Sequence, residues 1–138
     1  MAVGFRIDFL WYQIGQEDFL HAFFSTICYR LEQGNWGSKY PHLMNKLYQG
    51  ELAWEDVKSA RKELDDVSKC LKKLKPSDVI WDIDDIEKQP PWENKISHDI
   101  TDMSNYFVTS DGRDLIAIIF KVFDDAEEER IKIEIVSL

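Results

Sequence analysis

The sequence predicts an α+β fold: a single domain over residues 1–138, with about four strands in a mixed sheet and about four helices packed mainly on one face. Three observations support this prediction. Segments with alternating apolar residues, typical of strands, lie near both ends of the chain, whereas apolar residues spaced three and four apart, typical of amphipathic helices, fill much of the middle. The chain is long enough for one sizeable hydrophobic core, and 44% hydrophobic residues argue against a disordered protein.

The first half of the chain predicts one strand and three helices. Residues 3–14 combine β-branched and aromatic side chains and are expected to form a strand. Residues 17–33 place their apolar side chains on one wide helical stripe, with acidic residues at the start, where they suit the helix dipole. A short helix is expected over residues 40–49, and the clearest helical period runs through residues 53–75 until Pro76 ends it.

The second half predicts three strands and one helix. Residues 78–83 form a short apolar run and are expected to be a central strand, which an irregular stretch follows. A further strand is expected over residues 105–110. Residues 110–129 carry apolar side chains around so much of the circumference that a largely buried helix is predicted, and residues 130–138 alternate as a last strand.

The formal net charge of −9 is unevenly distributed along the chain. Residues 1–75 carry 11 Lys and Arg against 10 Asp and Glu, a net of +1, whereas residues 76–138 carry 6 against 16, a net of −10. Non-specific nucleic-acid binding needs a basic surface, so direct binding to nucleic acid is not expected. The electrostatic complement of the acidic half is a basic partner, although an acidic surface that only confers solubility has the same composition.

One stretch of the acidic half, VIWDIDDIEKQPPWE at residues 79–93, concentrates charge next to aromatic residues. The alternation of Asp82 and Asp84 after an apolar run resembles the paired carboxylates of magnesium-dependent haloacid-dehalogenase phosphotransferases. The N-terminal position and the glycine–threonine turn that accompany this motif are missing. As a calcium loop starting at Asp82, the stretch has Glu87 at the sixth position, where glycine is required. An oxygen-rich divalent site here would be weak and incidental.

A partner-binding surface fits this stretch better. Its carboxylates give a dense negative field, and tryptophan is frequent among the residues that dominate binding energy. Pro90 and Pro91 stiffen the stretch and so reduce the entropy lost on binding. Trp81 is expected to be either a further anchor or a buried strand residue. The residues expected to contact the partner are Asp82, Asp84, Asp85, Glu87 and Trp92.

Two other places are secondary candidates for the partner-binding surface. The loop NWGSKYP carries Trp36 and Lys39, and Trp36, close to Gly34 and Gly37, is expected either at an exposed loop tip or in the core. The run DDAEEE, residues 124–129, places acids at the C-terminal end of the last helix, where the helix dipole disfavours them. This conflict marks either a functional surface or a helix that ends near Phe123. The residues expected in this second patch are Asp124, Asp125, Glu127 and Glu128.

No catalytic constellation is found in the sequence. The histidines His21, His42 and His98 have no metal-ligand spacing with Cys28 or Cys70, and His21 is expected to be a satisfied core or boundary residue. No catalytic residue, no metal ligand and no cofactor are therefore expected. The N-terminal segment has no basic leader, the longest apolar run is too short to cross a membrane, and the two cysteines form no disulfide framework, so a cytoplasmic protein is expected.

Several passages of the chain resemble one known family. They are FRIDFLWYQIG, FLHAFFSTICYRLE, NWGSKYPHLMNKLYQGEL, VIWDIDDIEKQPPW and ISHDITDMSNYFVTSDGRDL, which follow one another in order from about residue 2 to residue 120. Together they resemble the immunity protein 70 family, small cytoplasmic proteins of bacterial polymorphic toxin systems. The resemblance covers nearly the whole chain, and none of the passages is a catalytic signature.

The resemblance implies an antidote rather than an enzyme. Such a protein binds the toxic C-terminal domain of a cognate secreted toxin and neutralises it in the producing or sibling cell. Many of these toxic domains are nucleases with basic clefts, which an acidic surface is suited to meet, either by covering the cleft or by binding beside it. A monomer or weak homodimer that contacts neither membrane nor nucleic acid is expected. The alternatives are a magnesium-dependent phosphohydrolase that uses Asp82 and Asp84, and an acidic nucleic-acid mimic that regulates several proteins.

Overall fold

The computed structural model describes residues 2–92 and 95–137, and the sheet that these residues form has four strands. The strands are β1 (Ala2–Ile7), β2 (Leu10–Gln16), β3 (Glu51–Leu52) and β4 (Ile133–Ser137), in the order β2-β1-β4-β3. The predicted α+β class is confirmed. The described sheet is antiparallel rather than mixed, because β1 turns straight back into β2 and the C-terminal strand enters antiparallel between β1 and β3.

Residues 3–14 form a hairpin instead of the single predicted strand. The chain reverses at Asp8 and Phe9, between β1 and β2, and Asp8 has a left-handed backbone with φ of 55°. Aspartate tolerates this conformation better than most residues, so a tight turn fits between the two apolar strands. Phe9 stands at this turn with 86% of its surface exposed.

The four predicted helical regions are all present. α1 (Glu17–Thr26) continues as a π-helical turn, Ile27–Leu31, and a second π-helical turn, Leu43–Leu47, lies where the short helix was predicted. The long helices are α2 (Val57–Leu71) and α3 (Leu115–Glu129). Within the described part of the chain, every helix is too short or too polar to span a membrane.

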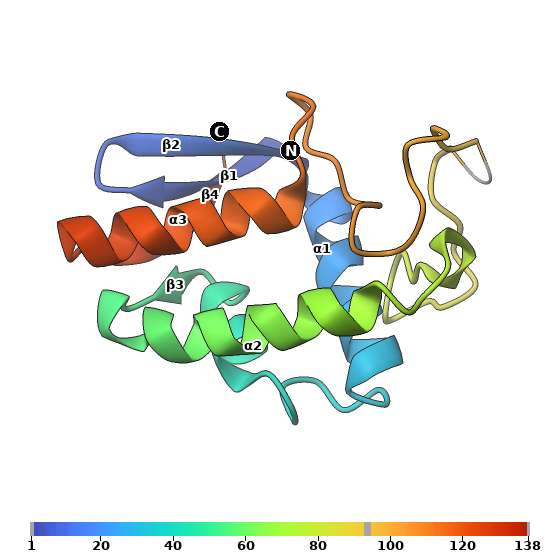
Figure 1. Cartoon of the computed structure of the whole chain (residues 1–138), viewed down its shortest axis with the longest axis horizontal. Helices are drawn as coiled ribbons and strands as arrows, with labels where there is room; N and C mark the ends of the chain where they lie inside the picture. Colours follow the sequence, from blue (N-terminus) through green and yellow to red (C-terminus); the bar gives the residue numbers. More distant parts are fainter. Residues whose placement is uncertain (1, 93–94, 138) are drawn as a thin grey trace.

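The sheet curves around α3, with β2 on one side of the helix and β3 on the other (Figure 1). α2 runs alongside α3, and α1 runs crosswise to both. The apolar faces of these elements meet in one hydrophobic core, in which Phe5, Phe23, Phe24, Leu64 and Phe123 are buried. Because full burial of such a side chain contributes about 1.5–3 kcal/mol, this core holds α1 and its exposed N-terminal turn in a fixed position.

Two predicted strands, at residues 78–83 and 105–110, are not strands in the structure. The first segment lies against α1, where the N–H of Ile80 donates to the side-chain hydroxyl of Thr26 at 3.0 Å. In the second segment, only Val108 forms an isolated β-bridge. An apolar run predicts that a segment is buried. A segment buried against a helix has the same apolar composition as one buried in a sheet.

Candidate functional site

The acidic loop, residues 82–87, follows the segment that packs against α1. Its backbone makes two successive turns: the N–H of Asp85 donates to the carbonyl oxygen of Asp82 at 3.0 Å, and the N–H of Lys88 donates to that of Asp85 at 3.0 Å. The Asp82 carboxylate also accepts the N–H of Asp84 at 2.9 Å, a local turn typical of aspartate. These bonds give the loop a defined shape while its other carboxylates stay exposed.

Buried hydroxyls of α1 hold the acidic loop in place. The Oγ of Ser25 accepts the N–H of Ile83 at 3.1 Å, and the Oγ1 of Thr26 accepts the N–H of Ile80 at 3.0 Å. Ser25 and Thr26 are both fully buried. Because a buried N–H without a partner costs about 1–3 kcal/mol, these bonds fix the point at which the acidic loop leaves the core.

His21 of α1 reaches the start of the acidic loop. Its Nε2 lies 3.3 Å from the Oδ1 of Asp82, and its Nδ1 lies 2.8 Å from the hydroxyl of Tyr48. The expectation that His21 is a boundary residue with satisfied ring nitrogens is confirmed. The N–H of Asp84 and the ring of His21 stabilise the ionised Asp82 and lower the pKa of its carboxyl group. Asp82 therefore joins α1 to the loop as a charged group.

An open depression of about 480 Å³ lies beside Tyr48, and we call it the acidic depression. The first turn of α1 lines it with the exposed acids Glu17 and Asp18. Burial raises the pKa of the Tyr48 hydroxyl, and the negative charges of Glu17, Asp82 and Asp84 raise it further. An acid of α1 and the acids of the acidic loop therefore all act on the Tyr48 hydroxyl, although they lie far apart in the sequence.

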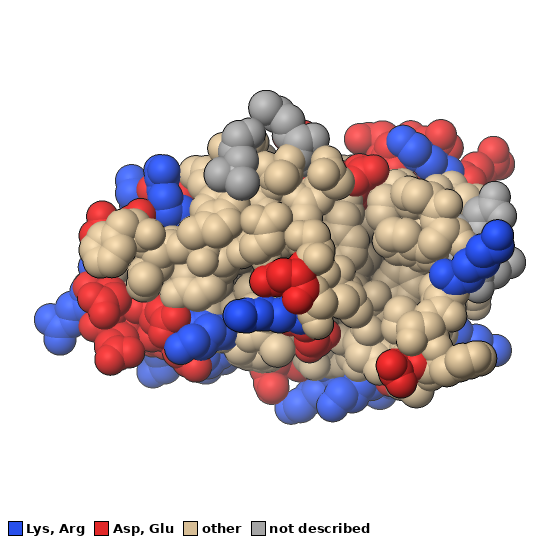
Figure 2. Space-filling view, turned by 90° about the horizontal axis from the view of Figure 1, so that it is seen from above, with Lys and Arg blue, Asp and Glu red and all other residues tan. Residues whose placement is uncertain are grey.

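The acidic loop keeps its charge uncompensated. Among the described residues, the carboxylates of Asp84, Asp85 and Glu87 form no ion pair, and Asp82 contacts only the ring of His21 in this way. Figure 2 shows a group of acidic side chains at the upper right of the molecule, with basic side chains beside it, at the end that the irregular segment after α2 occupies in Figure 1. This surface therefore presents a negative field to solvent.

The acids at the end of α3 are instead largely paired within the chain. Arg61 of α2 forms ion pairs with Asp124, at 2.7 Å, and with Glu127, while Asp125 pairs with Lys121 at 3.1 Å. Basic side chains lie among the acidic ones at the left end of Figure 2, where α3 ends. These pairs offset the unfavourable position of acids at the negative end of the helix dipole.

α3 continues to Glu129, which excludes the alternative that the helix ends near Phe123. Glu128 lies exposed on the last turn, and Arg130 ends the helix with a left-handed backbone of φ 56°. The conflict between these acids and the helix dipole is therefore real, and the cations on α2 and α3 relieve it in part.

The side chain of Trp92 contacts two other aromatic residues of the chain. Its ring packs edge-on against that of Trp81, with centroids 5.2 Å apart, and its Nε1–H donates to the hydroxyl of Tyr106 at 2.8 Å. Trp81 is buried, with 3% of its surface exposed, as expected for one of its two alternatives, although it does not lie in a strand. The large apolar side chain that the acidic loop exposes is Ile86, at 48%. Trp92 therefore packs against Trp81, the residue that precedes the acidic loop, and Ile86 is the exposed apolar group of the loop itself.

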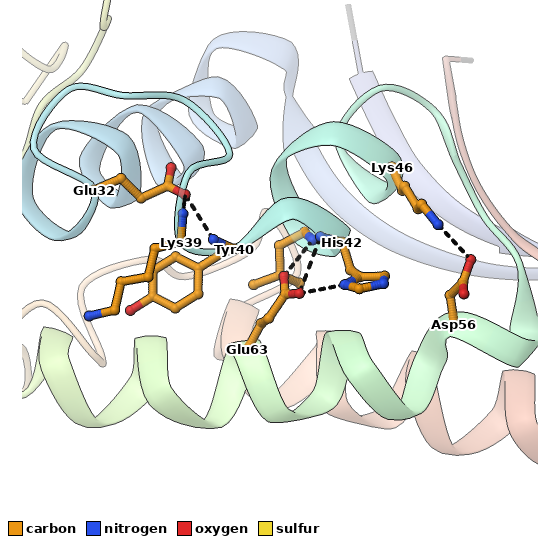
Figure 3. A network of polar contacts seen from close by, with 8 residues as sticks. Glu32, Lys39, Tyr40, His42, Lys46, Asp56 and Glu63 are labelled. Carbon is orange, nitrogen blue, oxygen red and sulfur yellow. Dashed lines mark hydrogen bonds and ion pairs between the residues drawn. The ribbon is translucent and has the colours of Figure 1, made fainter.

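A buried carboxylate fixes the loop that carries Trp36 and Lys39 (Figure 3). Glu32, with 2% of its surface exposed, accepts the backbone N–H of Gly37 at 3.1 Å and those of Lys39 and Tyr40 at 2.9 Å. Hydrogen bonds to a charged acceptor contribute about 1.5–3 kcal/mol each, so these three bonds stabilise the conformation of the loop.

Trp36 and Lys39 have different surroundings. The ring of Trp36 packs against Tyr48 with centroids 5.4 Å apart, and its Nε1–H donates to the carbonyl oxygen of Met44 at 3.0 Å. Lys39 is exposed, and its Nζ lies 3.7 Å from a carboxylate oxygen of Asp66 on α2. The structure thus links Trp36 to the acidic depression through Tyr48, whereas Lys39 pairs with α2.

His42 has a structural role in the polar network that also includes Glu32. Its Nδ1 lies 2.6 Å from the Oε2 of Glu63, whose carboxylate also accepts the N–H of Leu43 at 3.0 Å (Figure 3). Glu63 therefore ties the second π-helical turn to α2.

Comparison with models of protein families assigns the chain to one family. The family described as immunity protein 70 matches residues 5–135, which is nearly the full length. The chain belongs to the immunity protein 70 family. No curated protein and no solved structure matches it. The family name implies an immunity protein.

In this member of the immunity protein 70 family, the sequence indicates the acidic loop but not the groups that surround it. Glu17, Asp18 and Tyr48 were not predicted as site residues, because the acids of α1 suit the helix dipole and no local pattern connects them with the loop. His21 gave no signal because its contact with Asp82 joins distant parts of the sequence. The exposed Ile86 is a single apolar residue among charges, which periodicity does not distinguish.

Proposed function

We propose that this protein is the antidote of a cognate secreted bacterial toxin, whose toxic C-terminal domain it binds and neutralises. Family membership supports an immunity role. The acidic loop is the observation that supports a binding surface. Its exposed carboxylates form no ion pair within the described residues, and they lie near Glu17 and Asp18 of the acidic depression. The complement of such a surface is a basic face on the toxin domain.

The acidic loop combines two contributions that a tight complex needs. Attraction between opposite charges can raise association rate constants as far as about 10⁸–10⁹ M⁻¹s⁻¹ at low salt. The exposed Ile86 supplies apolar area that loses water in the complex and slows dissociation. The hydroxyls of Ser25 and Thr26 hold the loop in one shape before binding, so less conformational entropy is lost.

The acidic loop is the primary contact in this proposal, because a partner at the end of α3 must compete with the ion pairs of Arg61 and Lys121. Trp92 acts as the support of the loop. The secondary contacts in this proposal are Asp124, Asp125, Glu127 and Glu128 at the end of α3, and Trp36 and Lys39 in the loop after the first π-helical turn.

A basic toxin domain, such as a nuclease, is the partner that this surface fits, and the complex forms in the cytoplasm. The protein acts as a monomer or weak homodimer and needs no cofactor for this role. It either covers the basic cleft of the toxin or binds beside the cleft and blocks a motion. The acidic loop serves both arrangements, because electrostatic attraction acts over the Debye length of about 8 Å at physiological salt.

A pull-down with the tagged protein tests the proposal. The bait is added to lysate of the producing bacterium while the neighbouring toxin gene is expressed, at low and at high salt, and bound protein is identified by mass. We expect one stoichiometric partner with a basic C-terminal domain, and weaker capture at high salt. Capture of no such domain, together with a magnesium-dependent phosphatase activity that Asp82→Asn abolishes, would replace the antidote with the enzyme alternative.

A further inference from the structure

Three potential metal ligands from two separate elements converge at the edge of the acidic depression. They are a ring nitrogen of His21 on α1 and carboxylate oxygens of Asp82 and Asp84 in the acidic loop, and the three ligand atoms all lie within 4.8 Å of one another. Sequence spacing does not reveal this group, because the histidine and the aspartates meet only when the loop docks on α1 through Ser25 and Thr26.

The distance between His21 and Asp82 matches that between neighbouring ligands of a small divalent ion. Zinc binds nitrogen and oxygen ligands at about 2.0–2.2 Å, so two adjacent ligands lie about 3.0–3.4 Å apart in octahedral or tetrahedral geometry. The observed separation of Nε2 and Oδ1 is 3.3 Å. Asp84 is exposed, so rotation of its side chain closes the remaining gap without moving the core.

The other ring nitrogen of His21 also has a hydrogen-bond partner, as that of a metal-binding histidine usually has. Its Nδ1 lies 2.8 Å from the hydroxyl oxygen of Tyr48, which accepts a proton as well as it donates one. With Nδ1–H donating to Tyr48, the lone pair of Nε2 is directed at Asp82, where a cation can be bound. Without a cation, Tyr48 donates to Nδ1 and Nε2–H donates to Asp82, so the same network satisfies both states.

The charge around this group favours a cation. Glu17, Asp82 and Asp84 all act on Tyr48, the residue that holds His21, and the acidic depression leaves the outward side of the group open to water. A hard cation such as magnesium prefers oxygen ligands and sheds water reluctantly, whereas an imidazole nitrogen favours zinc and its neighbours.

We propose that His21, Asp82 and Asp84 form a binding site for a divalent ion of the zinc type, with water in the remaining coordination positions. The site goes beyond the antidote function and does not depend on it. A bound ion cancels two negative charges at the start of the acidic loop, so it also weakens the attraction to a basic partner. A bound ion then lowers the affinity for the toxin, and a bound toxin lowers the affinity for the ion.

Titration calorimetry of the full chain with zinc alone, in a buffer that does not chelate metals, tests this proposal. We expect one ion per chain. His21→Gln and Asp84→Asn should each weaken zinc binding by tenfold or more, since even loss of an outer partner of a metal ligand typically costs about 10–100-fold. Asp84 is exposed, so its variant reports on binding even if the His21 variant folds poorly. Cobalt should give the visible absorption of a nitrogen- and oxygen-bound ion.

Matched controls separate this site from adventitious binding. His98→Gln and Asp85→Asn change the same residue types at exposed positions outside the group and should leave the affinity unchanged. Equal binding by His21→Gln, Asp84→Asn and the parent chain would overturn the proposal, as would loss of binding only in Cys70→Ser. Because no toxin is present in the titration, its failure leaves the antidote function untouched.

Discussion

Thr26 and Ile80 hold each other through two contacts: the Thr26 hydroxyl accepts the N–H of Ile80 at 3.0 Å and lies 3.2 Å from the carbonyl oxygen of the same residue. Both residues are buried. This pair replaces the strand pairing that the apolar run at residues 78–83 predicted, and it attaches the acidic loop to α1.

Thr26→Val keeps the shape of the side chain but leaves the N–H of Ile80 without its acceptor. We expect a loss of about 1–3 kcal/mol in the free energy of unfolding, because a buried donor is left unsatisfied. Urea unfolding measures the loss, and the exposed Thr101→Val is the matched control. A Thr26→Val protein as stable as its parent would mean that the Ile80 N–H reaches water or another acceptor.

Reversing the charge of the acidic loop should weaken binding to the toxin domain. We expect Asp84→Lys combined with Asp85→Lys to raise the dissociation constant by tenfold or more, because like charges then face a basic partner. The melting temperature should not fall, since both carboxylates are exposed and form no ion pair within the described residues. Glu128→Lys combined with Glu129→Lys tests the secondary contact at the end of α3 in the same way. If this second variant alone lowers affinity, the end of α3 is the primary contact.

Glu32→Gln should destabilise the loop that carries Trp36. The carboxylate accepts three backbone N–H groups, and a glutamine amide offers only one acceptor oxygen while its NH₂ group opposes the remaining donors. We expect a loss of about 1–3 kcal/mol in the free energy of unfolding. Chemical denaturation measures it against the exposed Glu55→Gln, which should change stability by less than about 0.5 kcal/mol.

Tyr40→Phe should alter the dependence of stability on pH at both extremes. Burial and the hydrogen bond to Asp66, at 2.5 Å, raise the pKa of the Tyr40 hydroxyl, and the same bond lowers the pKa of the Asp66 carboxyl group. A raised tyrosine pKa gives stability that is complete below about pH 10 and is lost as pH rises through the folded-state value. A lowered aspartate pKa gives stability that is present above about pH 4 and is lost as pH falls.

The free energy of unfolding, measured from pH 2 to pH 11, tests this prediction. Tyr40→Phe should flatten both limbs of the profile and lower stability at pH 7, whereas the exposed Tyr29→Phe should keep the parent profile. Some alkaline dependence should remain in Tyr40→Phe, because the pKa values of Tyr12 and Tyr48 are also raised by burial. A Tyr40→Phe profile parallel to that of the parent would contradict the prediction.

The helices could be predicted from the sequence because their signal is local. In α2, the buried residues Val57, Ala60, Leu64, Val67 and Leu71 repeat at spacings of three and four, and no tertiary contact is needed to detect that period. The ends were less well predicted: the helix expected over residues 110–129 begins only at Leu115, after Asp114 caps it through the N–H of Ala117.

The strands were harder to predict because sheet pairing is not local. The turn at Asp8 divides one expected strand into two, and β3 consists of only Glu51–Leu52, too short for any alternating pattern. The segments at residues 78–83 and 105–110 have strand-like composition but are buried against helices. Composition therefore predicted which segments are buried and did not predict what covers them.

The candidate site, like the fold, could be predicted from the sequence only in its local features. The density of charge in the acidic loop is visible in the sequence, whereas its meeting with His21 and Tyr48 depends on how α1 packs. The contacts of Trp92 are also not local. Its ring packs against Trp81 and its N–H group donates to Tyr106, and its role as a binding anchor stays a prediction.

The attachment of the acidic loop to α1 by hydroxyl groups has an evolutionary consequence. Strand residues must alternate to suit the sheet, but residues 84–87 contribute no ladder hydrogen bond and no buried side chain, so substitutions there leave the fold intact. Ser25, Thr26 and the core can stay constant while the displayed charges and Ile86 change. One scaffold can thus present different charged surfaces without a change of fold.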